Sequence, residues 1–291
     1  MRQSGPEPRP TLGDHLQVAG AALFCGLFRI LPLDTASAVG GGIARAVGPR
    51  LGISKRARRN LKSAFPALSP PEIEHIVRAM WDNLGRVIAE YPHLARIRVF
   101  PPGDRVELRG VEHVDAALAA GRRLIMFGGH LGNWEIGALA ATQYGLSTVL
   151  IYRALNNPLA DAMLSRLRGD RAEFLPKGAV ASRGTIAAMR EGKHLLLLVD
   201  QKLNDGIPVR FFGRDAMTAP ALARLARRYD CDVLPVRTER LDGARFRLTV
   251  FPKLDISGDA NEAMTRVNET LEDWIRDRPE QWLWLHNRWP D

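Results

Sequence analysis

The sequence has very little cysteine: Cys25 and Cys231 are the only two among 291 residues. So few thiols exclude a disulfide-stapled scaffold and indicate a reducing compartment. No Cys-x-x-Cys pair occurs, and His194 and His286 lack the spacing of a zinc pair, so we predict no metal and no cofactor. A Gly-x-Ser-x-Gly element is also absent, which leaves a nucleophilic serine without support.

Internal repeats and low-complexity tracts are missing as well, so we expect one large domain or one domain with an appendage. The hydrophobic fraction of 46% is ordinary for a soluble α/β protein. The formal charge of +9 and the isoelectric point near 10.1 are not ordinary. A chain this basic indicates an anionic partner, which leaves nucleic acid, anionic lipid, a phosphorylated substrate or an acidic protein.

One apolar run stands out, at residues 16–33 (LQVAGAALFCGLFRILPL), with Arg29 as its single charge. Its length falls just short of the roughly 20 residues that a membrane-spanning helix needs. A cleaved signal peptide is disfavoured because Glu7 and Asp14 precede the run and no small-residue cleavage site follows. We therefore favour a membrane-embedded or interfacial anchor, with an amphipathic helix packed on the domain as the alternative.

A second charged feature follows at residues 55–62 (KRARRNLK), where five of eight residues are cations. Close to an apolar anchor, such a run suits the anionic cytoplasmic leaflet, but a solvated helix face explains it equally well. Nucleic acid is disfavoured, because no aromatic side chain lies among these cations to stack on a base.

The rest of the chain predicts an α/β fold. Residues 34–98 have helical patterns, with Ser69 as an N-cap before two prolines. From residue 122 onward, short apolar runs alternate with helical patterns, which favours a mostly parallel central sheet flanked by helices. The run at 194–199 is apolar on both faces, as a buried central strand requires. We predict strands at 122–128, 147–152, 194–199, 232–237 and 245–251, and helices at 133–144, 157–169, 181–191, 219–229 and 260–277.

The most informative motif spans residues 128–135 (GGHLGNWE), where a strand ends and a helix begins. His130 can point into a cleft there as a general base for an alcohol, and Glu135 of the first helical turn can hold the imidazole. Gly128 and Gly129 allow backbone N–H groups to approach a ligand closely. We predict Gly129 and Asn133 as substrate contacts of the same turn.

Polar residues follow other predicted strands, where parallel sheets bind their ligands. Arg153 follows one strand and suits a phosphate by its fork geometry. Asp200 and Gln201 follow another, where the carboxylate braces an arginine or the His130 site, or forms a purely structural pair. The loop 203–220 contains Gly and Pro as well as Phe211 and Phe212. We expect these two side chains to line an acyl path, to face lipid, or to fill the hydrophobic core. The C-terminal tryptophans are an interfacial belt or core residues.

Taken together, these blocks resemble the bacterial lipid A biosynthesis acyltransferases, the late lauroyl/myristoyl transferases of the lysophospholipid acyltransferase superfamily. The likeness covers nearly the whole chain. The matching blocks are Gly128–Glu135, Tyr152-Arg153 with Asn156-Asn157-Pro158, Asp200-Gln201, Phe211-Phe212-Gly213 with Thr218-Ala219-Pro220, Leu234-Pro235-Val236, and the ending Pro279–Trp289.

The resemblance implies a glycerol-3-phosphate acyltransferase-like fold with an N-terminal membrane anchor helix. It also implies transfer of a fatty acyl chain from acyl carrier protein to a hydroxyl of a hydroxyacyl chain on a lipid A precursor. His130 and Glu135 would be the general-base dyad, and Arg153 and Arg168 would bind the anionic substrate. No acyl-enzyme is needed, because the acceptor hydroxyl is the nucleophile.

The expected organisation is a tail and anchor at 1–35, a helical segment at 36–100 and a catalytic domain at 101–291. The expected partners are acyl carrier protein, a glycolipid acceptor and an anionic membrane, with no nucleic acid. The expected place is the cytoplasmic face of the inner membrane. Two alternatives remain: another lipid acceptor (a lysophospholipid, a mannosylated phosphoinositide or an ornithine lipid), and a catalytically silent lipid-binding protein.

Overall fold

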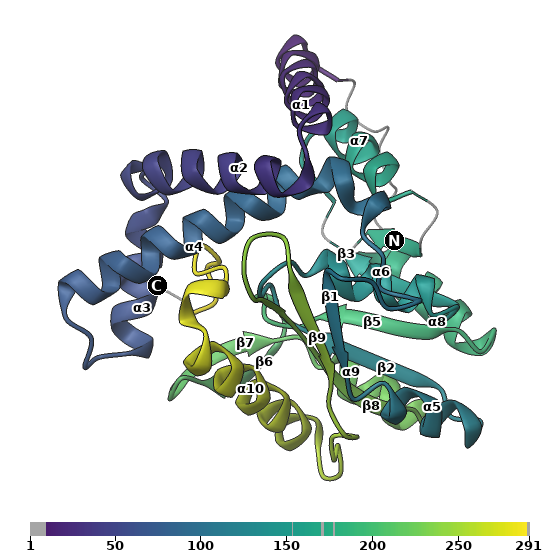
Figure 1. The fold of residues 1–291 in the computed structure, drawn as a ribbon. Coiled ribbons are helices and arrows are strands. Elements are labelled where there is room, and N and C mark those ends of the chain that lie inside the picture. Colours follow the sequence, from purple (N-terminus) through teal and green to yellow (C-terminus); the bar gives the residue numbers. More distant parts are fainter. Residues whose placement is uncertain (1–9, 153, 170–171, 177, 290–291) are drawn as a thin grey trace.

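The computed structural model of the protein describes residues 10–152, 154–169, 172–176 and 178–289 (Figure 1). Its α-helices are α1 (Leu12–Ile30), α2 (Leu33–Val47), α3 (Ser54–Ala64), α4 (Pro70–Glu90), α5 (Glu112–Ala119), α6 (Glu135–Gln143), α7 (Pro158–Arg168), α8 (Ala179–Arg190), α9 (Ala221–Arg228) and α10 (Ala260–Asp277). Short 3-10 turns lie at η1 (Gly48–Arg50), η2 (Tyr91–Arg96) and η3 (Pro279–Gln281).

The strands are β1 (Val106–Arg109), β2 (Leu124–Gly128), β3 (Thr148–Tyr152), β4 (Glu173–Pro176), β5 (His194–Leu198), β6 (Ile207–Phe211), β7 (Arg214–Thr218), β8 (Asp232–Arg240) and β9 (Phe246–Val250). Within the described residues, seven of them form one sheet in the order β1-β9-β8-β2-β5-β3-β4. Only β8 and β9 pair antiparallel there, and the other neighbours are parallel. The prediction of a mixed α/β fold with a mostly parallel central sheet is confirmed.

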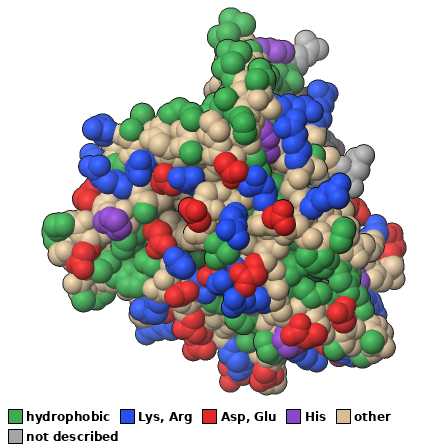
Figure 2. All heavy atoms as spheres, in the orientation of Figure 1, with side chains coloured by type: hydrophobic (Ala, Val, Ile, Leu, Met, Phe, Trp, Pro, Cys, Tyr) green, Lys and Arg blue, Asp and Glu red, His purple; other side chains and the backbone are tan. Residues whose placement is uncertain are grey.

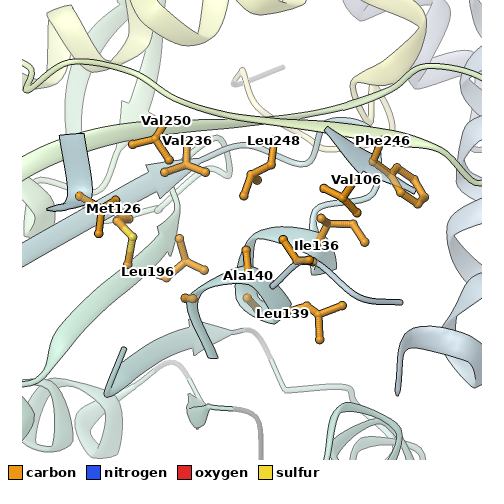
Figure 3. Packing of buried hydrophobic residues seen from close by; sticks show 14 of the residues in the cluster. Val106, Met126, Ile136, Leu139, Ala140, Leu196, Val236, Phe246, Leu248 and Val250 are labelled. Atoms are coloured by element: carbon orange, nitrogen blue, oxygen red, sulfur yellow. The ribbon is translucent and has the colours of Figure 1, made fainter. Parts of the chain in front are cut away.

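Successive residues of the central strands pack on opposite faces of this sheet. Met126 of β2 and Leu196 of β5 pack toward α5 and α6, as Figure 3 shows for part of that cluster. Phe127 and Leu197 pack with α8, α9 and α10 on the other face. Each fully buried side chain of this size stabilises the fold by about 1.5–3 kcal/mol. The prediction for 194–199 is confirmed, because β5 lies between β2 and β3.

A separate core joins the N-terminal helices to the C-terminal end of the chain. Leu61 of α3 and Met80 of α4 pack with Trp282, Trp284 and neighbouring aromatic residues. Trp282 and Trp284 are fully buried, so the interpretation of the C-terminal tryptophans as an interfacial belt is wrong for these two. This core fixes the segment after η3 against the sheet.

α1 projects from the body of the molecule beside α7, and its hydrophobic side chains are visible in Figure 2. Five of its large apolar side chains are exposed: Leu12, Leu16, Leu23, Leu27 and Ile30. No helix in the described ranges combines the length and the apolar character that crossing a membrane requires. The predicted N-terminal anchor is therefore not supported as a spanning helix. α1 carries Asp14, His15 and Arg29, and Pro32 follows its end.

Candidate functional site

The register between β2 and β5 brings two of the predicted residues together. Gly128 and Leu198 are direct partners at the carboxyl ends of these parallel strands. His130 lies two residues after Gly128, and Asp200 lies two residues after Leu198. Both side chains therefore leave the sheet at the same edge. The peptide N–H of Val199 also donates to the carbonyl of Gly128, at 3.0 Å, which continues the pairing into this turn.

Asp200 holds His130 by two contacts. One carboxylate oxygen, Oδ1, lies 2.8 Å from Nδ1 of the imidazole. The other, Oδ2, accepts the backbone N–H of His130 at 2.8 Å and the indole N–H of Trp282 at 2.8 Å. Burial alone would raise the pKa of the fully buried Asp200, but the charge of His130, its hydrogen bonds and the charge of His286 hold that pKa well below its usual range. The carboxylate is thus kept ionised against the imidazole.

Glu135 does not hold the imidazole in this structure, contrary to the prediction from the motif. Its carboxylate forms a bidentate pair with Arg168, at 2.7 and 3.0 Å, and accepts the phenol of Tyr91 at 2.8 Å. As the first residue of α6, Glu135 lies at the far end of the turn that starts at His130. The carboxylate that meets the imidazole is instead that of Asp200.

Burial shapes the pKa values around Glu135. Burial and the charge of Glu135 raise the pKa of Tyr91 well above its usual value, so the phenol keeps its proton and donates. Burial acts to lower the pKa of Arg168, but the hydrogen bonds and charge of Glu135, together with the contact with Tyr91, outweigh burial and raise it. The guanidinium also lies over the rings of Tyr152 and Phe174, at 5.6 and 4.7 Å from their centres. Arg168 therefore sits charged among aromatic rings.

A cavity of about 280 Å³ is lined by both His130 and Glu135, while Asp200 lies behind the imidazole. His130, Glu135, Arg168 and Gln201 contribute its polar wall, with Gln201 Nε2 3.4 Å from His130 Nε2. The remaining lining is mainly apolar: Trp134, Ala138, Leu150, Ile151, Leu155, Leu164, Phe174, Leu196, Leu198 and Leu283, together with Tyr91, Tyr152 and His286. Such a cavity suits an apolar chain that carries one reactive polar group.

The other predicted site residues lie elsewhere or have a different role. Asn133 is buried and bonds to Glu90, and it does not line the pocket, so it is no substrate contact in this structure. Phe211 and Phe212 are buried among Trp282, Trp284 and Trp289. Their predicted place on an acyl path or against lipid is therefore wrong, and the core-plug alternative holds.

Gly129 lies against the carboxylate of Asp200. An added Cβ at Gly129 would lie 3.3 Å from Asp200 Oδ2 and closer still to Leu131 and Leu271, so the glycine lets the dyad pack closely. Its contact with substrate stays a prediction. Arg153, the predicted main anion contact, lies outside the described residues.

One group in the described part of the chain has the donor types of a transition-metal site: His130, Asp200 and His286, with candidate ligand atoms within 4.8 Å of one another. Tetrahedral zinc with ligands at about 2.0 Å would require a separation of roughly 3.3 Å. Both oxygens of Asp200 are already hydrogen-bonded, so the arrangement fits an acid–imidazole dyad with a second imidazole better than a metal centre. The rings of His130 and His286 meet edge to face, with centres 4.8 Å apart.

The family model of bacterial lipid A biosynthesis acyltransferases matches residues 11–291 of this chain. The chain belongs to this family. It is an acyltransferase, in agreement with the sequence prediction.

Curated relatives carry related names. The lipid A biosynthesis lauroyltransferase of Escherichia coli K12 is 27% identical over 81% of this chain and 78% of its own length. The lipid A biosynthesis myristoyltransferase of the same organism is 28% identical over 81% of this chain and 75% of its own length. The phosphatidylinositol mannoside acyltransferase of Mycolicibacterium smegmatis is 26% identical over 99% of this chain and 95% of its own length.

Three site residues were not predicted in their present roles. Tyr91 comes from the η2 turn and reaches Glu135, and nothing in its local sequence marks it. Trp282 and His286 lie in the C-terminal block that the resemblance already included, so that block was the available signal. A β-bridge between Leu131 and Trp282 places this block beside the turn 130–135.

Proposed function

We propose that this acyltransferase moves a fatty acyl chain from acyl carrier protein to a hydroxyl of a hydroxyacyl chain on a lipid A precursor. The observation that carries the proposal is the 2.8 Å contact between Asp200 Oδ1 and His130 Nδ1 in the wall of a mainly apolar cavity. Asp200 replaces Glu135 as the acid partner of the base. Glu135 and Arg168 form a second polar group in the same wall.

In the proposed reaction, His130 uses Nε2 as the base, because the N–H at Nδ1 donates a hydrogen bond to Asp200. Nε2 takes the proton of the acceptor hydroxyl as its oxygen attacks the thioester carbonyl carbon. The carbon–sulfur bond then breaks, and the imidazolium returns the proton to the leaving thiolate of the carrier. The products are the new ester and the free thiol, with no acyl-enzyme. Asp200 stabilises the imidazolium throughout.

The size and polarity of the substrates match the surroundings of this dyad. The apolar lining suits an acyl chain, and the charge of +9 favours an acidic carrier protein and a phosphorylated glycolipid. We propose that Arg168 takes part in orienting the anionic acceptor, although its guanidinium is paired with Glu135 here. An acidic carrier protein that docks on a basic face of this acyltransferase should be released by salt. We expect the affinity for the carrier to fall steadily as the salt concentration rises from about 0.05 to 0.5 M.

The acceptor has a second candidate. The mycobacterial relative named for phosphatidylinositol mannoside aligns with nearly the whole chain, further than the lipid A enzymes do. A mannosylated phosphoinositide is therefore the alternative acceptor for the same dyad. Mass spectrometry of lipids from cells with and without the gene separates the two: loss of one acyl chain from lipid A supports our proposal, and unchanged lipid A contradicts it.

We further propose that the exposed apolar side of α1 lies in the interface of the inner membrane, on the cytoplasmic face. Leu16, Leu23 and Leu27 are 66, 65 and 57% exposed, and α1 packs beside α7, which carries Arg168 of the pocket. Contiguous exposed apolar side chains of this size mark an interaction surface. We expect L16D/L23D/L27D to lose binding to anionic vesicles while keeping activity on detergent-dispersed acceptor. Vesicle binding equal to that of the original protein contradicts the proposal.

The catalytic proposal is tested by His130→Ala with acyl carrier protein as donor and purified acceptor. We expect turnover to fall by at least about 10³-fold, since the base is removed. Activity that survives this change excludes the mechanism. If the original protein itself binds the acceptor without any turnover, the lipid-binding alternative stands instead.

A further inference from the structure

Glu90, at the end of α4, is a fully buried carboxylate outside the pocket, and the mechanism above does not use it. It accepts four hydrogen bonds: from Ser37 Oγ at 2.6 Å, from Asn133 Nδ2 at 2.8 Å, and from two Arg240 nitrogens at 2.5 and 2.9 Å. A buried charge of this kind persists only when it is paired and hydrogen-bonded. The four bonds join Glu90 to α2, to the end of β8 and to the catalytic turn.

Asn133 is the link between Glu90 and the catalytic turn. Its amide nitrogen donates to Glu90, while its amide oxygen accepts the backbone N–H of Glu135 at 3.1 Å. Asn133 lies between His130 and Glu135 in the chain. Its side chain therefore ties the start of α6 to Glu90. Its side chain is 1% exposed, so no substrate reaches it.

Arg240 holds the same turn by a second route, through Gly132. The carbonyl of Gly132 accepts from Asn83 Nδ2 at 3.0 Å, and its N–H donates to the carbonyl of Gln281 at 3.1 Å. Arg240 braces both of these partners: Nε donates to Asn83 Oδ1, and its backbone N–H donates to Gln281 Oε1, each at 2.8 Å. Gly132 has a φ of +54°, and an added Cβ would meet the carbonyl oxygen of Thr238 at 2.6 Å.

We propose that Glu90 and Arg240 are positioning residues for the acyl transfer. Through Asn133 and Gly132, they fix the turn 130–135 and so set the place of the base, His130, relative to Glu135. Displacement of a catalytic group by about 1 Å can cost on the order of 10²-fold in rate, so a rigid turn has a catalytic value beyond its stability. This inference rests on the proposed function, because it assumes that His130 is the base.

The chain offers a matched pair of variants for the test. Asn133→Ser keeps an oxygen that can accept the backbone N–H of Glu135 but is too short to donate to Glu90. Ser37→Ala removes one hydrogen bond from the same carboxylate and is equally buried, but it does not touch the catalytic turn. We expect Asn133→Ser to lower kcat by at least ten-fold with KM within two-fold, and Ser37→Ala to leave both within two-fold.

An exchange of side-chain types gives a rescue experiment. Asn133→Asp places a second carboxylate against Glu90 and should lower kcat further than Asn133→Ser. Adding Glu90→Gln returns one amide and one carboxylate to this contact, with the donor and acceptor exchanged. We expect the double variant to recover kcat to within ten-fold of the original protein. This variant also decides the question if Asn133→Ser is too unstable to assay.

Three results overturn the inference. The first is a kcat loss below ten-fold in Asn133→Ser, and the second is an equal kcat loss in Ser37→Ala. The third is a double variant whose kcat is no higher than that of Asn133→Asp. The proposed function fails separately: it fails if His130→Ala stays active. An inactive His130→Ala together with a fully active Asn133→Ser removes only the positioning role.

Discussion

Two carboxylates hold side chains of one cavity wall, Asp200 from behind His130 and Glu135 from within the wall, and they have different kinds of partner. Asp200 is fully buried and meets an imidazole and an indole, whereas Glu135 meets a guanidinium and a phenol. The first pair can pass on a proton, because an imidazole can donate from Nδ1 while it accepts at Nε2. In the second pair the guanidinium stays charged, because its contacts raise its pKa. One end of the cavity is thus suited to proton transfer and the other to a fixed electrostatic contact.

The comparison teaches that motif spacing identifies the polar ends of a turn without identifying their partners. His130 and Glu135 are five residues apart, yet the turn between them points their side chains at different neighbours. Asp200, seventy residues away in sequence from His130, is the one at hydrogen-bond distance. The parallel register of β2 with β5 brings Asp200 next to His130.

The largest effect is expected at the imidazole end. Asp200→Asn should lower kcat by about 10³–10⁴-fold, because an amide N–H facing Nδ1 favours the wrong imidazole tautomer. Steady-state kinetics with the same donor and acceptor give the number. Asn keeps an oxygen for Trp282, so near-native Trp fluorescence serves as the folding control. A loss smaller than ten-fold would assign the acid role elsewhere.

A smaller catalytic effect is expected at the guanidinium end. Glu135→Gln keeps an acceptor for Tyr91 but leaves Arg168 with an uncompensated charge at 12% side-chain exposure. Breaking a buried pair costs about 3–5 kcal/mol of unfolding free energy. We expect that destabilisation in urea unfolding, with a kcat loss well below that of Asp200→Asn.

The double variant Glu135→Gln/Arg168→Gln sharpens this prediction. Without the lone guanidinium, more than half of the lost stability should return, since both charges are gone. If Glu135→Gln instead lowers kcat as much as Asp200→Asn while the protein stays folded, both ends of the cavity take part in the proton transfer and the comparison fails.

The smallest effect is a pH dependence of stability. The pKa of Asp200 is lowered in the folded protein, while in the unfolded chain it is about 3.9. Its ionised form therefore contributes stability fully above about pH 5, and this contribution is lost as the pH falls below 4. The difference in unfolding free energy between the original protein and Asp200→Asn should narrow from pH 5 to pH 3 in urea titrations. A difference that widens in that range contradicts the assignment.

Much of the fold was predictable because its signals are local. The helix 260–277 was predicted with its observed bounds, and the structure gives it an Asp259 cap with Glu262 three residues into the helix. The Ser69 cap is also confirmed, and the helix it begins runs to Glu90. Alternation of strands and helices was enough to predict the parallel sheet.

Other parts depended on contacts between distant segments or on a missed turn signal. The loop expected at 203–220 contains the hairpin β6–β7, whose two turn residues, Phe212 and Gly213, have φ values of +52° and +69°. Positive φ at both positions is what a type I′ hairpin turn needs, and Phe is rarely found there. The strands β1 and β4 are only four residues long and were missed for lack of pattern.

Within the site, His130, Gln201 and Arg168 were singled out from the sequence and line one cavity, and Asp200, also singled out, contacts His130. Their pairing was not predictable, because strand order is not written in local spacing. Glu90 and Arg240 gave no signal at all, since single charged residues in helices and strands are normally solvated. Only the fold shows that this pair is buried behind the turn 130–135.

The central claim is that Asp200, and not Glu135, sets the tautomer of His130. It is tested most directly by ¹⁵N NMR of histidine-labelled protein at pH 8, with His130→Gln used to assign the signal. We predict a neutral imidazole with its proton on Nδ1, unchanged in Glu135→Gln and shifted toward the Nε2–H form in Asp200→Asn. A signal that shifts in Glu135→Gln and stays unchanged in Asp200→Asn would contradict the account.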